Sequence, residues 1–145
     1  MISHQQWGNN WLAVSPPGAA RIDLGRSAAS RRTAAHEVRD LPPGTPVVLS
    51  ASAPRAVGRC RSFASAAGIE LEREYLAFPS AQAPAYLVED APASASVFVR
   101  TILVAPPGTA LSTAIDACLG ILRLLPSSRL IRVLAPGRVV VGRRT

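Results

Sequence analysis

Three clusters of arginine carry most of the chemistry that this sequence offers. Every one of the 16 strongly basic residues is arginine, and the chain contains no lysine. The clusters are Arg26/Arg31/Arg32, Arg55/Arg59/Arg61 and Arg138/Arg143/Arg144. A guanidinium is permanently charged and presents five donors in a fork that matches phosphate and carboxylate oxygens. If the clusters converge in the fold, they form an anion-binding surface for a nucleotide-sugar, a lipid phosphate or an acidic leader peptide.

The formal net charge of +7 raises nucleic acid as a partner, because a basic field attracts polyanions. However, a chain that is rich in alanine, arginine and proline and lacks lysine is typical of a GC-rich, actinobacterial-type genome, which accounts for part of the charge. Aromatic residues are only 5% of the chain, too few for a platform on which bases stack. We therefore expect nucleic acid to be an unlikely partner and keep an arginine-driven polyanion binder as an alternative.

Three glutamates alternate along the predicted strand 69–78 at Glu70, Glu72 and Glu74. Alternation places them on one face of a strand, where carboxylates can raise one another's pKa or bind a cation. We interpret the row as a solvated outer face. His36-Glu37 offers no catalytic pair either, because adjacent residues of a helix point apart.

Two cysteines, Cys60 and Cys118, lie far apart in the sequence and outside any metal-binding spacing. Each falls on the apolar side of a predicted helix, so both are interpreted as buried small hydrophobic residues. The two histidines have no cluster of cysteines or carboxylates at ligand spacing. The sequence therefore predicts no metal site.

A strand–helix–strand unit positions the middle arginine cluster. Residues 46–50 form a continuously apolar strand, as in a sheet covered on both faces. The helix 55–67 has one apolar stripe, and Gly68 suits the position just after its end. The strand 69–78 follows and fits an edge or a strand exposed on one side. The stripe consists of Ala56, Val57, Cys60, Phe63, Ala64 and Ala67.

The remaining pattern extends this unit in both directions. We expect a strand at 21–24 that forms a hairpin or a pair of successive strands with 11–14, and a helix at 27–39. A short strand is expected at 85–88, in a hairpin with the strand before it. Residues 90–104 are ambiguous between helix and strand, and a helix is favoured. A helix at 111–125 and a last strand at 138–141 complete the set.

These elements predict one α/β domain over residues 1–145, a small Rossmann-like partial sheet of about four to six strands with helices packed on it. Residues 1–10 are expected to be flexible, and residues 90–145 to form a helix-rich C-terminal extension. The N-terminus lacks a basic and apolar leader, and no apolar run is long enough to span a bilayer. A cytoplasmic location is expected.

The segment 41–88 resembles the C-terminal half of class I SAM-dependent methyltransferases. In that family an L-x-P-G-G type turn leads into the fifth strand, a helix follows, a glycine-containing turn begins the sixth strand, and a seventh strand pairs antiparallel to it. Here Leu41-Pro42-Pro43-Gly44, the strand 46–50, the helix 55–67, Gly68-Ile69 and the strand 85–88 stand at corresponding places. The run 75–88 looks like the tail of methyltransferase-like proteins of bacterial glycan and natural-product pathways.

The resemblance implies a cofactor site that this sequence departs from. The family's first strand carries an acidic residue followed by a glycine-rich turn, for which only Asp23 and Gly25 are candidates. About 40 residues before Leu41 cannot hold four strands and their helices, because one β-α-β unit needs roughly 30. No cofactor is therefore expected. If one is bound, the resemblance implies that it is S-adenosylmethionine.

The sequence favours a non-catalytic or accessory methyltransferase-like protein of a bacterial biosynthetic pathway, which binds a partner protein or an anionic ligand. The alternative is a minimal methyltransferase or other transferase with a site shared across a dimer; catalytic residues remain unknown. In that case Tyr75, Tyr86, Arg55 and Arg59 are candidate substrate contacts around the 77–86 loop. The apolar stretches 97–104 and 111–125 favour a homodimer with the late helices at its interface.

Overall fold

A computed structural model describes residues 13–52, 55–101, 120, 131–132 and 135–145. It confirms an α/β fold, a small Rossmann-like partial sheet with helices packed on it. The strands are β1 (Ala20–Asp23), β2 (Pro46–Ser52), β3 (Ile69–Phe78), β4 (Tyr86–Glu89) and β5 (Gly137–Arg144). The helices are α2 (Ala28–Asp40), α3 (Ala56–Ala67) and α4 (Pro92–Thr101). None of the described helices is long and apolar enough to cross a membrane.

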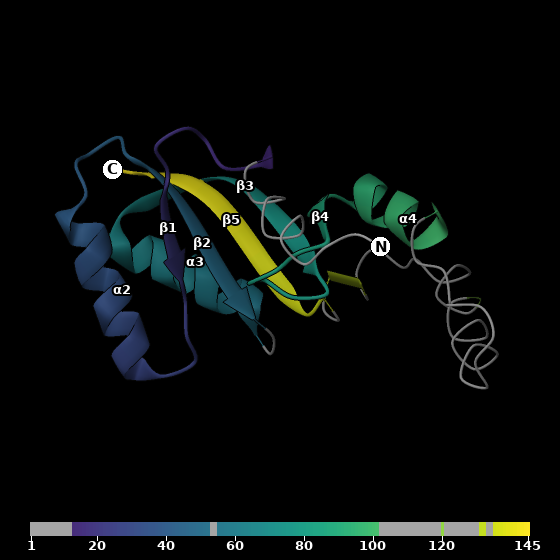
Figure 1. The fold of residues 1–145 in the computed structure, drawn as a ribbon, viewed down its shortest axis with the longest axis horizontal. Helices are drawn as coiled ribbons and strands as arrows, with labels where there is room; N and C mark the ends of the chain where they lie inside the picture. The colour runs from purple at the N-terminus through teal and green to yellow at the C-terminus, as the bar shows by residue number, and fades with distance from the viewer. Residues whose placement is uncertain (1–12, 53–54, 102–119, 121–130, 133–134) are drawn as a thin grey trace. The chain divides into compact units, whose positions relative to one another are not determined.

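The five strands form one open, mixed sheet in the order β1-β2-β5-β3-β4 (Figure 1). β1 and β2 are parallel, and β5 is antiparallel to both β2 and β3. β1, β2 and β3 therefore run in the same direction, and α2 and α3 make the two crossovers. β3 has neighbouring strands on both sides. It is therefore not an edge strand, which was one of the two positions expected from its alternating apolar and polar residues. β4 is its neighbour, as the expected hairpin requires.

The chain forms two compact units, residues 1–87 with 135–145, and residues 88–134. The first unit contains most of the sheet, including β5, which comes from the end of the region expected to be a helix-rich extension. In the second unit, α4 (Pro92–Thr101) confirms a helix within residues 90–104, of which residues 102–104 lie outside the described residues. The expected helix 111–125, its place in a homodimer interface, Cys118 and residues 1–12 lie outside the described residues.

Local sequence explains where α2 and α3 begin and end. Ser27 caps α2 by accepting a hydrogen bond from the Ser30 backbone N–H at 3.0 Å. Leu41 takes an extended conformation before Pro42 and stops the helix. α3 ends at Gly68, whose left-handed φ of 65° closes the last turn through a bond from its N–H to the Ala64 carbonyl.

One face of the sheet and the two helices share the main hydrophobic core. From α2 it takes Ala34 and Val38, and from α3 it takes Ala56, Cys60, Phe63 and Ala64. These side chains pack on Val47, Leu49, Ala51 and Val140 of the sheet. α2 and α3 therefore lie side by side on the same face. The other face buries Val48, Ala77, Val139 and Val141, with Tyr75 packed against them.

A β-bulge in β3 overturns the expected row of glutamates. The register against β5 shifts between Leu71 and Arg73. Before the shift, Ile69 and Leu71 face the main core, so Glu70 points to the other face. After it, Tyr75 and Ala77 face that other side, which turns Glu74 toward the main core. The three carboxylates therefore do not share one face, because the extra residue reverses the alternation.

Candidate functional site

A groove lies between α2 and α3 of the first unit. It consists of two hollows of about 320 and 400 Å³ that share Arg31, Phe63 and Ala66. We call their combined lining the α2–α3 groove. Its residues are Ala28, Arg31, Arg32 and Ala35 of α2, Arg55 just before α3, and Gly58, Arg59, Ser62, Phe63, Ala66 and Ala67 of α3.

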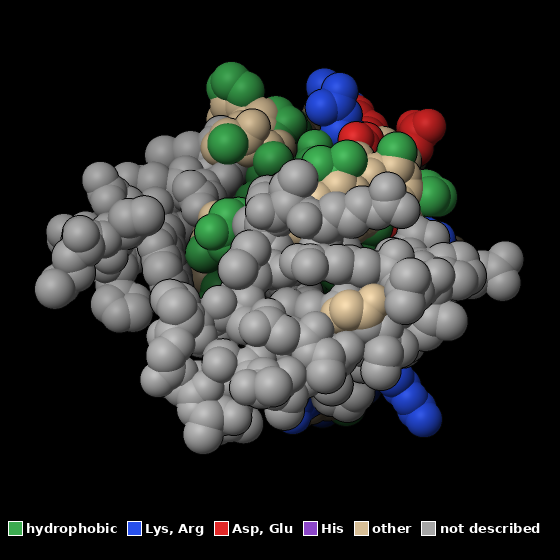
Figure 2. All heavy atoms as spheres, turned by 90° about the vertical axis from the view of Figure 1, so that its right-hand side faces the viewer, with side chains coloured by type: hydrophobic (Ala, Val, Ile, Leu, Met, Phe, Trp, Pro, Cys, Tyr) green, Lys and Arg blue, Asp and Glu red, His purple; other side chains and the backbone are tan. Residues whose placement is uncertain are grey.

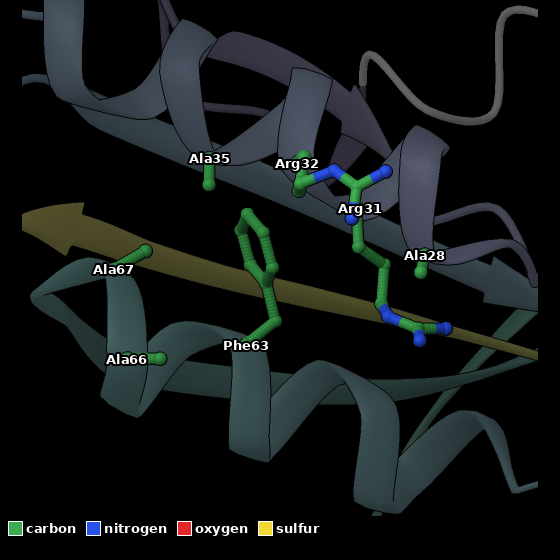
Figure 3. Close-up of a pocket in the computed structure, with 7 residues that line it drawn as sticks. All are labelled: Ala28, Arg31, Arg32, Ala35, Phe63, Ala66 and Ala67. Carbon is green, nitrogen blue, oxygen red and sulfur yellow. The ribbon is translucent and has the colours of Figure 1, made fainter.

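The floor of the groove is hydrocarbon. Figure 3 shows Phe63 projecting from α3 toward α2, with Ala35 opposite it and Ala66 and Ala67 beyond it on α3. The phenyl ring closes the gap between the helices and is only 8% exposed. An apolar ligand surface would therefore meet the alanine methyl groups and one edge of this ring.

Four arginines border this floor. Arg31 reaches from α2 toward α3, whereas the guanidinium of Arg32 stays beside α2 (Figure 3). Arg55 and Arg59 come from the start of α3. Two arginines of the first cluster and two of the second thus line the same groove, whereas Arg26 and Arg61 are not among its lining residues.

The groove arginines differ from the other arginines in their partners. Arg31 donates to the Arg26 carbonyl at 2.8 Å, and Arg59 donates to the Ser52 carbonyl. Within the described ranges, no carboxylate pairs with any of the four. Elsewhere arginines pair with carboxylates: Arg61 and Arg138 with Glu74, Arg143 with Glu72, and Arg132 with Asp90. Among the described residues, the positive charge of the groove therefore has no carboxylate partner.

The electrostatic field at one end of the groove is reinforced by the helices. α2 and α3 connect parallel strands, so they run parallel and begin at the same end, where Arg31, Arg55 and Arg59 lie. A helix N-terminus carries a partial positive charge. In contrast, the face shown in Figure 2 displays acidic (red) and basic (blue) side chains in the same upper region. The groove is thus cationic at one end and apolar along its floor.

Asp23 and Gly25 lie at the carboxyl end of β1. The Ser50 hydroxyl, which is buried, donates to Asp23 Oδ1 at 2.9 Å. A Cβ on Gly25 would stand 2.3 Å from Ser30 Oγ, so this glycine allows the chain to pass close to the first turn of α2. The structure therefore brings the two predicted cofactor residues to one strand end, and each has a structural contact there.

A second polar cluster covers the ends of β1 and β2. Gln82 donates through Nε2 to Ser52 Oγ at 2.8 Å, and the backbone carbonyl of Gln82 accepts from the Arg21 guanidinium at 3.4 Å. The loop that carries Gln82 approaches β5 closely, because a Cβ on Gly137 would stand 2.5 Å from the Ala81 backbone nitrogen. The polar groups of this cluster satisfy one another.

The predicted substrate contacts are not brought together as one set. Arg55 and Arg59 lie at the groove, on the face of the sheet covered by α2 and α3. Tyr75 packs on the opposite face, and Tyr86 is 49% exposed on β4. Sequence reasoning did not assign Phe63 to the site, and it named Arg31 only as a member of an arginine cluster. The sequence signal that could have predicted the groove is the presence of arginines near the beginning of both α2 and α3. Both helices connect parallel strands, and they cover the same face of the sheet.

Cys60 lies beneath α3 and is fully buried. Burial raises the pKa of its thiol to about 12, against the lowering effect of Arg59. The buried small hydrophobic residue expected from the sequence is confirmed. Among the described residues, no group of three or more histidine, cysteine and carboxylate side chains could hold a metal.

The burial of Cys60 predicts an alkaline loss of stability. A pKa raised above the ordinary 9.0 means that stability is fully present below pH 9 and falls as the pH rises toward 12. Because each unit of pKa difference is worth about 1.4 kcal/mol, we expect a loss of several kcal/mol across this window. Urea unfolding from pH 8 to 11 measures it, and the lysine-free composition keeps competing titrations few.

The matched control for this measurement is Cys60→Ala. This variant should be less stable at pH 8 and should show a flatter decline above pH 9. An equal slope in both proteins would contradict the assignment. In the native protein at pH 8 we also expect slow reaction of Cys60 with an aromatic disulfide reagent, since only the thiolate reacts.

No family model matches this sequence, and comparisons with curated proteins and with solved structures also find no match.

Proposed function

We propose that this chain is a non-catalytic, methyltransferase-like accessory protein of a bacterial biosynthetic pathway, which binds an anionic ligand or partner in the α2–α3 groove. The observation that carries the proposal is the convergence of Arg31, Arg32, Arg55 and Arg59 around an apolar floor. A cytoplasmic location is part of this proposal.

The chemistry of the lining supports binding. Its polar side chains are guanidinium groups and the Ser62 hydroxyl, and the rest is hydrocarbon. An arginine is not deprotonated in proteins, so it orients and neutralises an anion and does not act as a general base. A ligand that fits both parts of the groove has an anionic group beside an apolar body.

The sheet supports the methyltransferase-like part of the proposal. The resemblance implies an antiparallel seventh strand at residues 85–88, beside the strand that begins at Gly68-Ile69. In the structure β4 is a neighbour of β3, and β5, on the other side of β3, is antiparallel to it. The resemblance also implies the strand–helix–strand order of β2, α3 and β3. These features are common to many α/β proteins, so they support the lineage less strongly than the groove supports binding.

Binding to the groove can be tested with two small anions. We expect octyl phosphate to bind more tightly than inorganic phosphate, because its chain covers the floor around Phe63 while its head group meets the arginines. Titrations followed by ¹H–¹⁵N spectra should shift the arginine Nε–H signals of Arg31 and Arg55. The double variant Arg31→Gln/Arg55→Gln should weaken octyl phosphate binding about tenfold or more.

The control is Arg39→Gln, which removes one exposed arginine of α2 outside the groove and is compared with the single variant Arg31→Gln, so that the change in net charge is equal. It should leave the affinity unchanged. Equal binding of the two anions, or equal losses in the groove and control variants, would show attraction by net charge alone and would contradict the proposal.

The minimal methyltransferase remains a second candidate, favoured by one observation. Asp23 stands at the carboxyl end of β1 next to the start of α2, which is where open α/β sheets bind ligands. Calorimetric titration with S-adenosylmethionine and S-adenosylhomocysteine, at high protein concentration, tests this candidate. Saturable binding that Asp23→Asn abolishes would establish it and would replace the accessory role.

A further inference from the structure

We infer that the occupant of the α2–α3 groove is an acidic amphipathic helix of a partner protein. The inference rests on the proposed function and narrows its ligand to one class. It is argued from the shape of the groove, from the charge around it and from the exposure of its aromatic residue.

The shape suits a helix. The lining of the groove follows α3 from Arg55 to Ala67, which corresponds to about 18 Å at the helical rise of ~1.5 Å per residue. Ala35 on one side and Ala66 and Ala67 on the other are small, so a third helix can approach closely. A helix of about twelve residues, with apolar anchors at i, i+4 and i+7, would cover this length.

An acidic occupant would complement the charge of the groove. The chain has nine acidic residues, and eight of them are described. None of these eight pairs with a groove arginine, and the ninth is Asp116. The undescribed segments 1–12, 53–54 and 121–130 contain no acidic residue. A second copy would bring the same net charge of +7. Carboxylates on a partner therefore complement this groove best.

The burial of Phe63 argues against nucleic acid as the occupant of the groove. Single-stranded bases bind by stacking on open aromatic faces, and Phe63 is only 8% exposed with its ring between the helices. A small molecule would normally have about 70–90% of its surface buried in its pocket, which an open groove between two helices does not provide. A helix is recognised through one face, so an open groove suffices.

A designed peptide tests this inference. The probe is a fluorescein-labelled twelve-residue peptide with leucines at i, i+4 and i+7 and glutamates on both flanks. Its controls are a scrambled peptide of the same composition and a peptide with lysine in place of glutamate. We expect the ordered peptide to bind at least about tenfold more tightly than the scrambled one. Circular dichroism should show that its helicity rises on binding.

Two variants of α3 locate the binding. Ala66 is exposed on the groove floor, and Ser65 is an exposed neighbour outside the lining. Ala66→Glu should reduce binding of the ordered peptide about tenfold or more, whereas Ser65→Glu should have little effect. Both substitutions add the same charge on exposed positions of one helix, so folding and net charge are matched.

The other outcomes overturn the inference in different ways. Equal affinity for the ordered and scrambled peptides would show that the groove binds anions in general and does not recognise a helix. Tighter binding of a twelve-nucleotide single-stranded DNA would identify nucleic acid. A dimer seen by light scattering and dissolved by Ala66→Glu would identify a second copy. If octyl phosphate binds and the peptides do not, the proposed function stands and the inference fails; if neither binds, both fail.

Discussion

Replacing Glu74 with glutamine is expected to lower the free energy of unfolding by about 3 kcal/mol, because removing one partner of a buried ion pair is strongly destabilising. The other partner is Arg138, whose side chain is 2% exposed and whose Nη1 lies 3.8 Å from Glu74 Oε2. Arg61 holds the same carboxylate in place through bonds of 2.8 and 3.1 Å. Urea unfolding at pH 7 measures the loss.

Two control substitutions separate the buried charge from its surroundings. Arg61→Gln removes a guanidinium that is 55% exposed and should cost less than about 1 kcal/mol. Arg138→Met replaces the buried cation with a hydrocarbon chain and should be close to neutral, as replacements of buried charges by apolar residues often are. If Arg138→Met were as destabilising as Glu74→Gln, the loss would come from packing and not from the broken ion pair.

Replacing Gly142 with alanine is expected to destabilise the protein by about 2–3 kcal/mol through overpacking. The new Cβ would stand 2.3 Å from the Glu70 carbonyl oxygen, a backbone atom that cannot move without shifting β3. Gly142 lies opposite Leu71, next to the register shift in β3. The substitution should also disturb that bulge, so amide protection in β3 should fall together with the free energy of unfolding.

Gly58→Ala is the matched control, and it is expected to raise the free energy of unfolding instead of lowering it. Gly58 lies inside α3, and a Cβ there meets no atom within 4 Å. Alanine is favoured over glycine in a helix interior by roughly 0.5–1 kcal/mol, so this variant should be more stable than the parent. If both glycine substitutions changed stability equally, the close approach of β5 to β3 would not be the cause.

The sequence predicted most elements because their signals are local. The Ser27 cap, the apolar stripe of α3 and the glycine at its end each act within a few residues of the chain. The strand–helix–strand unit of β2, α3 and β3 therefore agrees with the pattern, and the helix favoured over the start of 90–104 is confirmed by α4.

The features that the sequence did not predict depend on neighbours distant in the chain. The bulge at Leu71–Arg73 reflects pairing with β5, so the alternation of the glutamates was a wrong guide to their faces. The interior place of β3 depends on β4 and β5 together. The groove is formed where two separate crossover helices meet. The sequence alone therefore did not show whether their arginines lie close together in the fold.

The central place of β5 has a consequence for the order of events during synthesis. Ser50 pairs with Val139, and Leu71 pairs with Gly142, so the sheet closes only through contacts between residues far apart in the chain. Such contacts form late and slow folding. On the ribosome, β2 and β3 therefore emerge with the edges that β5 later joins still open to other strands. A nascent chain that pauses before residue 137 is thus at risk of aggregation, and chaperone protection is most valuable to it in that interval.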